Sequence, residues 1–153
     1  MYNGNMVIYI GADHGGFELK EQIKSWLSQN SYEVEDFGAD SLNPEDDYPD
    51  FIILVAEKVV LNSKSLGIVI GRSGNGEAIA ANKVKGIRAA VCLNVEMAEK
   101  AKEHNNANIL SLGADYIQRE EAEEIVRTFL DTPFSNEERH MRRLDKIEAL
   151  ENS

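Results

Sequence analysis

The chain has 153 residues, of which 42% are hydrophobic, so it has the length of one domain and enough apolar side chains for a substantial core. It contains no run of about 18 apolar residues and no basic start followed by a long apolar centre, so we expect no membrane span, no secretory leader and a cytoplasmic protein. The net charge of −11 argues against general binding to nucleic acid or to a membrane surface.

Short apolar runs alternate with segments of helical periodicity along the whole chain. We expect strands at 6–10, 32–37, 66–70, 87–93 and 108–112. We expect helices after Gly16, over 51–61, from Glu77 onward, and over 95–103, 119–130 and 135–150. In the second of these helices, helical spacing relates Phe51, Leu54, Val55, Lys58 and Val59, and residues 39–50 should form a polar loop with two prolines.

Strands and helices that alternate at least five times predict a parallel sheet covered by helices on both faces. The expected architecture is therefore a three-layer α/β/α sandwich with a Rossmann-like five-stranded parallel sheet, formed by residues 1–153 as a single domain. No strand follows the last helix, over about 135–150, so we expect that helix to leave the sandwich and to pack on another subunit.

The stretch 66–84, LGIVIGRSGNGEAIAANKV, combines a buried strand, a glycine turn and a helix start. Gly71, Gly74 and Gly76 end the strand, and Glu77 opens a run of strong helix formers. A turn of this kind points backbone N–H groups outward and favours an anion, with a carboxylate beside it. The loop has no P-loop lysine and no G-x-G-x-x-G pattern, and a tight turn that needs glycine for steric reasons alone is the alternative.

The three histidines of the chain lie in conspicuous places: His14 follows Asp13 after the first strand, His104 ends a helix, and His140 lies among arginines. Their spacing includes no H-x-x-x-H pair, so we expect no metal site. The single cysteine, Cys92, sits in an apolar run, which predicts a buried and inert thiol.

Arg139 and Arg143, in the segment ERHMRR, are four residues apart and therefore share one helix face. Two guanidinium groups side by side suit a phosphate. Ordinary ion pairing with Glu138 or Glu148 on a solvated helix is an equally good interpretation of the sequence alone.

Five motifs in order, GADHGGFELK, DDYPDF, GRSGNGEAIAANKVKGIRAA, EHNNANILSLGA and TPFSNEERHMRRLD, resemble ribose-5-phosphate isomerase type B, in the ribose/galactose isomerase family. Many members carry a cysteine base at the end of the central strand, where this chain has Gly71. A second kind has a GSGNGE loop with a glutamate base, and RSGNGE here matches that kind, so the resemblance assigns the base to Glu77.

The resemblance implies an enzyme of the pentose phosphate pathway that interconverts D-ribose 5-phosphate and D-ribulose 5-phosphate through an enediolate, without metal or organic cofactor. It implies catalytic roles for Glu77 as base, His104 as proton donor in ring opening, Asp13, and the loop from Ser73 whose amides stabilise the oxyanion. It implies substrate binding by Asp13, His14, Arg72, Ser73, Gly74, Asn75, Gly76 and Asn105, with Arg139, His140 and Arg143 at the phosphate.

His104 should lie at the amino edge of the sheet, opposite Asp13 and Glu77. The resemblance therefore implies a homodimer, or a tetramer of paired dimers, with composite sites in which His104 and Asn105 come from the partner subunit. The family commonly has an arginine after the fifth strand where this chain has Asp115, and Arg72 stands where glycine is frequent. Either Arg72 replaces that positive charge or the substrate differs.

Two other functions remain open from the sequence. The substrate could be a six-carbon sugar phosphate, such as allose 6-phosphate or galactose 6-phosphate. The chain could also be a sugar-phosphate-binding module without catalysis, although it has Glu77, Asp13 and His104 together.

Overall fold

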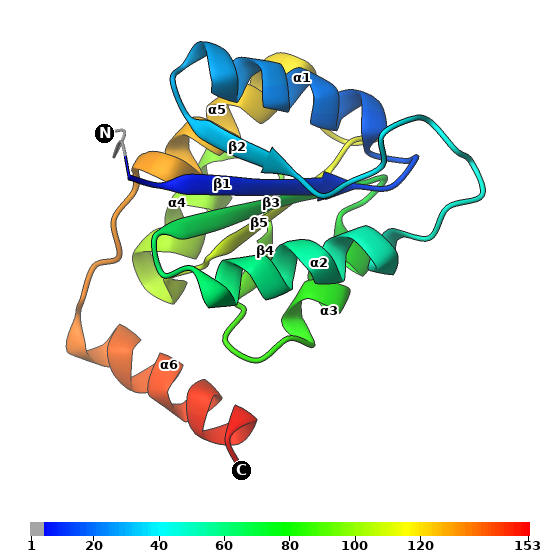
Figure 1. Cartoon of the computed structure of the whole chain (residues 1–153). Coiled ribbons are helices and arrows are strands. Elements are labelled where there is room, and N and C mark those ends of the chain that lie inside the picture. Colours follow the sequence, from blue (N-terminus) through cyan, green and yellow to red (C-terminus); the bar gives the residue numbers. More distant parts are fainter. Residues whose placement is uncertain (1–4) are drawn as a thin grey trace.

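A five-stranded parallel sheet forms the centre of the computed structural model, which describes residues 5–153 (Figure 1). The strand order is β2-β1-β3-β5-β4, and every neighbouring pair is parallel. The strands are β1 (Val7–Ala12), β2 (Glu33–Asp36), β3 (Ser65–Gly71), β4 (Ala89–Val91) and β5 (Ile109–Gly113). The expected α/β sandwich with a parallel sheet is confirmed.

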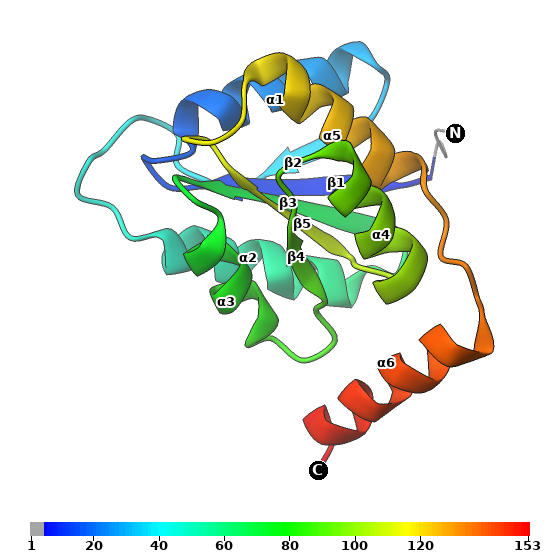
Figure 2. The same ribbon diagram turned by 180° about the vertical axis from the view of Figure 1, so that it is seen from behind.

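Helices cover both faces of this sheet (Figures 1 and 2). One layer holds α1 (Phe17–Gln29), α4 (Val95–Asn105) and α5 (Arg119–Asp131), and the other holds α2 (Tyr48–Leu61) and α3 (Asn75–Asn82). Side chains of β1 alternate between the two layers: Ile8 and Ile10 belong to the core under α1 and α5, and Tyr9 belongs to the core under α2. No helix in the described residues is long and apolar enough to cross a membrane.

Helix α2 differs from the expectation at its start, and its buried face includes only part of the set that helical spacing relates. It begins at Tyr48, three residues early, because Pro49 fits the first helical turn, where its missing N–H leaves no bond unmade. Its buried side chains are Ile52, Val55, Ala56 and Val59. Leu54 and Lys58, which follow the helical period in the sequence, are exposed, and Leu54 is 44% exposed, since packing against the sheet selects the more continuous apolar stripe.

Other boundaries shift by a few residues. Strand β1 continues through Gly11 and Ala12, and β4 keeps only three residues because it is an edge strand paired with β5 alone. Helix α4 extends to Asn105, so His104 lies in its last turn. Helix α6 (Glu138–Glu151) starts three residues later than expected. These shifts leave the positions of the candidate site residues in the fold unchanged.

The strand order reverses between β1 and β3: β2 is added on one side of β1, and β3 is then added on its other side. Ligands of open α/β sheets bind outside the carboxyl ends of the strands at such a reversal. Helix α6 lies at the opposite, amino edge and extends away from the body (Figures 1 and 2).

Candidate functional site

The turns that follow β1 and β3 bring Asp13 next to the glycine loop. Ala12 pairs with Ile70 in the parallel register, so the next residues, Asp13 and Gly71, lie side by side at the carboxyl edge. Asp13 is 8% exposed, and its Oδ1 accepts a hydrogen bond from the Gly15 N–H at 3.0 Å. A buried carboxylate is thereby fixed at the reversal point of the sheet.

Glu77 lies against the end of β3. Its side chain is 5% exposed, and a Cβ built on Gly71 would lie 2.1 Å from its Cδ. Gly74 caps α3 with a φ of +85°, a conformation that favours glycine, and its carbonyl accepts a 2.7 Å hydrogen bond from Ser111 Oγ on β5. The loop is therefore anchored to the sheet, and Glu77 stands on the first turn of α3 as predicted.

Burial raises the pKa of Glu77, and the negative charge of Asp13 raises it further. Hydrogen bonds from the backbone N–H groups of Glu77 and Gly74 oppose the shift and lower the pKa in part. A carboxylate whose pKa is moved upward toward neutrality is a better general base than an ordinary exposed glutamate. Two carboxyl groups with different environments at one sheet edge are typical of acid–base sites.

The backbone amides of the glycine loop are less open than the sequence suggests. The Asn75 N–H donates to Ser73 Oγ at 3.2 Å, and the Gly74 N–H faces the Glu77 carboxylate. Gly76 lies against a ring, because a Cβ there would be 2.7 Å from Tyr48 Cζ. The amides of Asn75 and Gly74 are thus already engaged within the loop.

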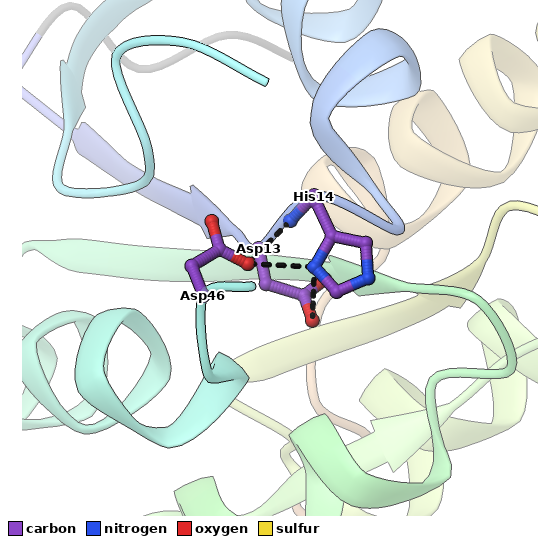
Figure 3. A group of neighbouring side chains, drawn as sticks. All are labelled: Asp13, His14 and Asp46. Atoms are coloured by element: carbon purple, nitrogen blue, oxygen red, sulfur yellow. Dashed lines mark hydrogen bonds and ion pairs between the residues drawn. The ribbon is translucent and has the colours of Figure 1, made fainter. Parts of the chain in front are cut away.

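Asp46 joins this edge from the loop between β2 and α2, a residue that the sequence did not single out (Figure 3). Its Oδ1 accepts hydrogen bonds from the His14 N–H at 3.0 Å and from His14 Nδ1 at 2.7 Å. The carboxylate of Asp13 approaches the same ring nitrogen, with Oδ2 3.8 Å from His14 Nδ1. Only its place in the DDYPDF motif could have marked Asp46, since the contact spans 32 residues.

Asp13, His14 and Asp46 offer ligand atoms within 4.8 Å of one another, as a metal site would. The short bond between His14 Nδ1 and Asp46 Oδ1 already uses one ligand atom from each of two residues. We therefore interpret the group as a hydrogen-bonded histidine between two carboxylates.

Arg72 and Asp115 lie together at the rim of the site. Their side chains form an exposed ion pair with 3.8 Å between Nη1 and Oδ1. Arg72 also passes over the β1–α1 turn, because a Cβ on Gly15 would lie 2.7 Å from Arg72 Cγ. An open pocket of about 790 Å³ begins here and is lined in part by His14, Arg72 and Asp115.

The remaining site candidates lie at the opposite edge, around the end of α4. The rings of His104 and His140 are 4.4 Å apart between centroids. His140 is buried, and its Nδ1 is 2.8 Å from Ser135 Oγ, so its ring turns inward from the expected phosphate face. Burial lowers the pKa of His140, and the charges of His104 and Arg139 lower it further.

Arg139 and Arg143, the two arginines of α6 that were expected at the phosphate, are exposed at this edge. Arg139 Nε is 2.8 Å from Glu137 Oε2, a partner that the sequence did not indicate, and 57% of the Arg139 side chain is exposed. No ion pair links Arg143 to another residue in the described part of the chain. Asn105, the last residue of α4, is also exposed.

One chain thus assembles half of the expected site at each edge of its sheet. Asp13, His14, Glu77 and the loop 72–76 gather at the carboxyl edge. His104, Asn105, Arg139, His140 and Arg143 gather at the amino edge. Cys92 belongs to neither group: it is 1% exposed, and burial raises the pKa of its thiol to about 12.

Known proteins resemble this chain over nearly its whole length. A family model described as Ribose/Galactose Isomerase matches residues 8–147. The ribose-5-phosphate isomerase B of Mycolicibacterium paratuberculosis is 48% identical over 95% of this chain and 92% of its own. The solved Clostridium thermocellum ribose-5-phosphate isomerase B is 48% identical, with a TM-score of 0.92 over 96% of this chain and 98% of its own.

A further solved structure contains a sugar phosphate. The ribose-5-phosphate isomerase B of Mycoplasma genitalium, with bound ribulose-5-phosphate, is 42% identical to this chain. Its TM-score is 0.93, and the match covers 97% of each chain.

Proposed function

The chain belongs to the ribose/galactose isomerase family, and we propose that it is an aldose–ketose isomerase that interconverts D-ribose 5-phosphate and D-ribulose 5-phosphate. The observation that carries this function is the meeting of Glu77 and Asp13 at the ends of β3 and β1. The reaction needs a base that takes a proton from one sugar carbon and returns it to the next, and a buried carboxylate with a raised pKa suits that task.

Glu77 is the base in this proposal. It removes the proton from C2 of the open-chain aldose, which gives an enediolate, and it delivers a proton to C1 to form the ketose. In the same conversion the C2 hydroxyl loses its proton to become the carbonyl, and the former carbonyl oxygen on C1 gains one. Charge develops on the substrate oxygen during this step, and donors fixed beforehand stabilise it. The amides of Ser73 and Gly76 and the Ser73 hydroxyl are the donors that we assign to that oxygen, within the loop 72–76.

Ring opening and phosphate binding require the residues of the other edge. We assign the proton donor for ring opening to His104, with Asp13 facing it across the sugar and Asn105 beside it. The contact between the His104 and His140 rings supports the assignment of Arg139 and Arg143 to the same part of the site as His104. The contribution of His140 to the phosphate stays a prediction, since its ring is buried.

These two groups meet if two copies of the chain pair as a homodimer with composite sites. The partner subunit would then supply His104, Asn105 and the arginines to the edge that holds Glu77. Exposed apolar side chains support such an interface: Leu61 is 83% exposed, and on α6 Ile147 and Leu150 are 50% and 75% exposed. An extended helix with apolar residues at this exposure is typical of a surface that a second subunit covers.

A panel of pentose and hexose phosphates tests the proposed function. Purified protein is incubated with ribose, ribulose, allose and galactose phosphates, and formation of the ketose from each aldose, or of the aldose from ribulose phosphate, is measured. We expect the highest kcat/KM with ribose 5-phosphate. Arg72 and Asp115 at the rim give a reason to include the hexose phosphates, because a changed charge pattern there alters the sugar that fits. Absence of turnover with every sugar phosphate would contradict the proposal.

A further inference from the structure

Asp46 holds His14 through two hydrogen bonds to a single oxygen (Figure 3). The backbone N–H of His14 donates to Asp46 Oδ1 at 3.0 Å, and Nδ1 of the ring lies 2.7 Å from the same atom. One bond fixes the backbone of the turn after β1, and the other fixes the ring. A ring bond of this length is typical of a charge-assisted hydrogen bond.

The two carboxylate oxygens of Asp46, Oδ1 and Oδ2, differ in their hydrogen bonding. Asp46 Oδ2 is buried and has no hydrogen-bond partner within residues 5–153. Within that part of the chain, every hydrogen bond of this carboxylate therefore goes to His14. A buried carboxylate oxygen without a partner costs folding free energy, so stability alone does not explain an aspartate at this position.

The bond also decides which ring nitrogen is available. An ionised carboxylate only accepts hydrogen bonds, so the proton of the shared bond resides on His14 Nδ1. Nε2 is then the atom left for a ligand. Asp13 Oδ2, 3.8 Å from Nδ1, approaches the same nitrogen, and Nε2 has no hydrogen bond to any of residues 5–153. His14 is partly exposed, and it lines the open pocket beside Arg72.

We propose that Asp46 is a positioning residue: it fixes the orientation and tautomer of His14 so that Nε2 faces the sugar phosphate. This inference rests on the proposed function, because it treats His14 as a substrate-binding residue. A carboxylate that orients a histidine through one ring nitrogen controls what the other nitrogen can do. Asp46 comes from the loop before α2, so that loop becomes part of the site.

Side-chain NMR tests the orientation directly in the free protein. The chain has only three histidines, and His104→Ala and His140→Ala variants assign the His14 ring signals. We expect ¹⁵N shifts of the Nδ1–H tautomer and a strongly downfield Nδ1 proton in the wild type. In Asp46→Ala the tautomer signature should shift toward that of a free imidazole. In Asp46→Asn, whose amide oxygen still accepts a hydrogen bond, the chemical shift of the Nδ1 proton should move only part of the way toward its value in Asp46→Ala.

Kinetics supply the second readout. We expect kcat/KM for ribose 5-phosphate to fall by about ten-fold or more in Asp46→Ala, and by less in Asp46→Asn, as for other residues that orient a binding histidine. Asp47→Asn is the matched control, because Asp47 is adjacent and exposed and its side chain makes no cap hydrogen bond to α2. It removes the same charge and should leave kcat/KM unchanged.

The inference is overturned if the His14 signals of Asp46→Asn match the wild type, or if they change while kcat/KM does not. It is also overturned if Asp47→Asn loses as much activity as Asp46→Asn. Asp46→Asn keeps the shape of the side chain, so the test stands even if Asp46→Ala does not fold. Wild-type turnover is measured first, so a failure of the proposed function appears there and not in the variants.

Discussion

The carboxylate of Glu77 occupies the volume that a side chain on Gly71 would fill: a Cβ on Gly71 would lie 2.1 Å from Glu77 Cδ and 2.3 Å from Oε1. The end of β3 must therefore lack a side chain for the carboxylate to stand where it does. Some relatives that the sequence resembles carry a cysteine base at this strand end. A cysteine side chain here would occupy the volume that the Glu77 carboxylate fills, so this geometry accommodates one base or the other.

Gly71→Ala should disable the enzyme without unfolding it. The added methyl group displaces a flexible carboxylate and not the backbone, so the fold survives, whereas a misplaced base should lower kcat by about a hundred-fold. Gly67→Ala is the control: its Cβ would press on Ile109 Cγ1 at 2.9 Å, away from Glu77. It should lower the melting temperature and spare kcat. Wild-type kcat in Gly71→Ala would contradict the placement of Glu77.

The raised pKa of Glu77 predicts a pH-dependent cost in stability. Because the folded protein favours protonated Glu77, the free energy of unfolding should fall as pH rises from the ordinary value of 4.5 through the raised pKa. Glu77→Gln removes this fall. Denaturation at a series of pH values should therefore show the variant more stable than the wild type at neutral pH, and equally stable well below pH 4.5.

Asp13→Asn tests whether the negative charge of Asp13 contributes to the raised pKa of Glu77. It removes a negative charge that raises the pKa of Glu77, so the acid limb of the kcat/KM profile should move to lower pH while kcat itself falls. If the acid limb stays in place, the charge of Asp13 does not affect the pKa of Glu77.

Composite sites predict that two inactive variants rescue each other. Glu77→Gln and His104→Ala homodimers are mixed, partly unfolded and refolded together. If His104 serves the partner's site, each hybrid dimer holds one intact site, and random pairing should restore about a quarter of the wild-type activity.

The control for this rescue pairs variants from one edge. Glu77→Gln mixed with Asp13→Asn places a defect in each site of the hybrid, so little activity should return. Equal recovery in both mixtures, or an active monomer in solution, would rule out the composite arrangement.

Arg72→Ala tests the replacement of the missing arginine after β5. We expect KM for ribose 5-phosphate to rise by about ten-fold, as for loss of a charge-assisted hydrogen bond, with a smaller change for the unphosphorylated sugar. Asp115→Asn, which frees Arg72 from its ion pair, should lower KM for the phosphate ester. If both sugars respond alike to Arg72→Ala, the arginine does not bind phosphate.

Much of the fold, and the placement of Glu77 and His104 at opposite edges of the sheet, could be predicted because they depend on local patterns. Glycines after an apolar run, followed by helix formers, located Glu77 on the first turn of α3. The position of His104 before β5 likewise located it at the amino edge, since parallel strands share one direction.

The missed features depend on contacts between distant segments. Asp46 meets His14 across 32 residues, in a loop whose path no periodicity describes. The buried face of α2 could not be read from its own sequence either, because nearly every position there is apolar and only the sheet selects among them. The inward turn of His140 likewise depends on Ser135 and on the end of α4.

Deuterium exchange with Glu77→Gln tests the central claim most directly. Ribose 5-phosphate is incubated with each protein in deuterated water, and loss of the C2 proton is followed by NMR alongside measured substrate binding. The account predicts exchange with the wild type, and loss of most of it in Glu77→Gln while binding persists. Undiminished exchange in Glu77→Gln would show that another group moves the proton.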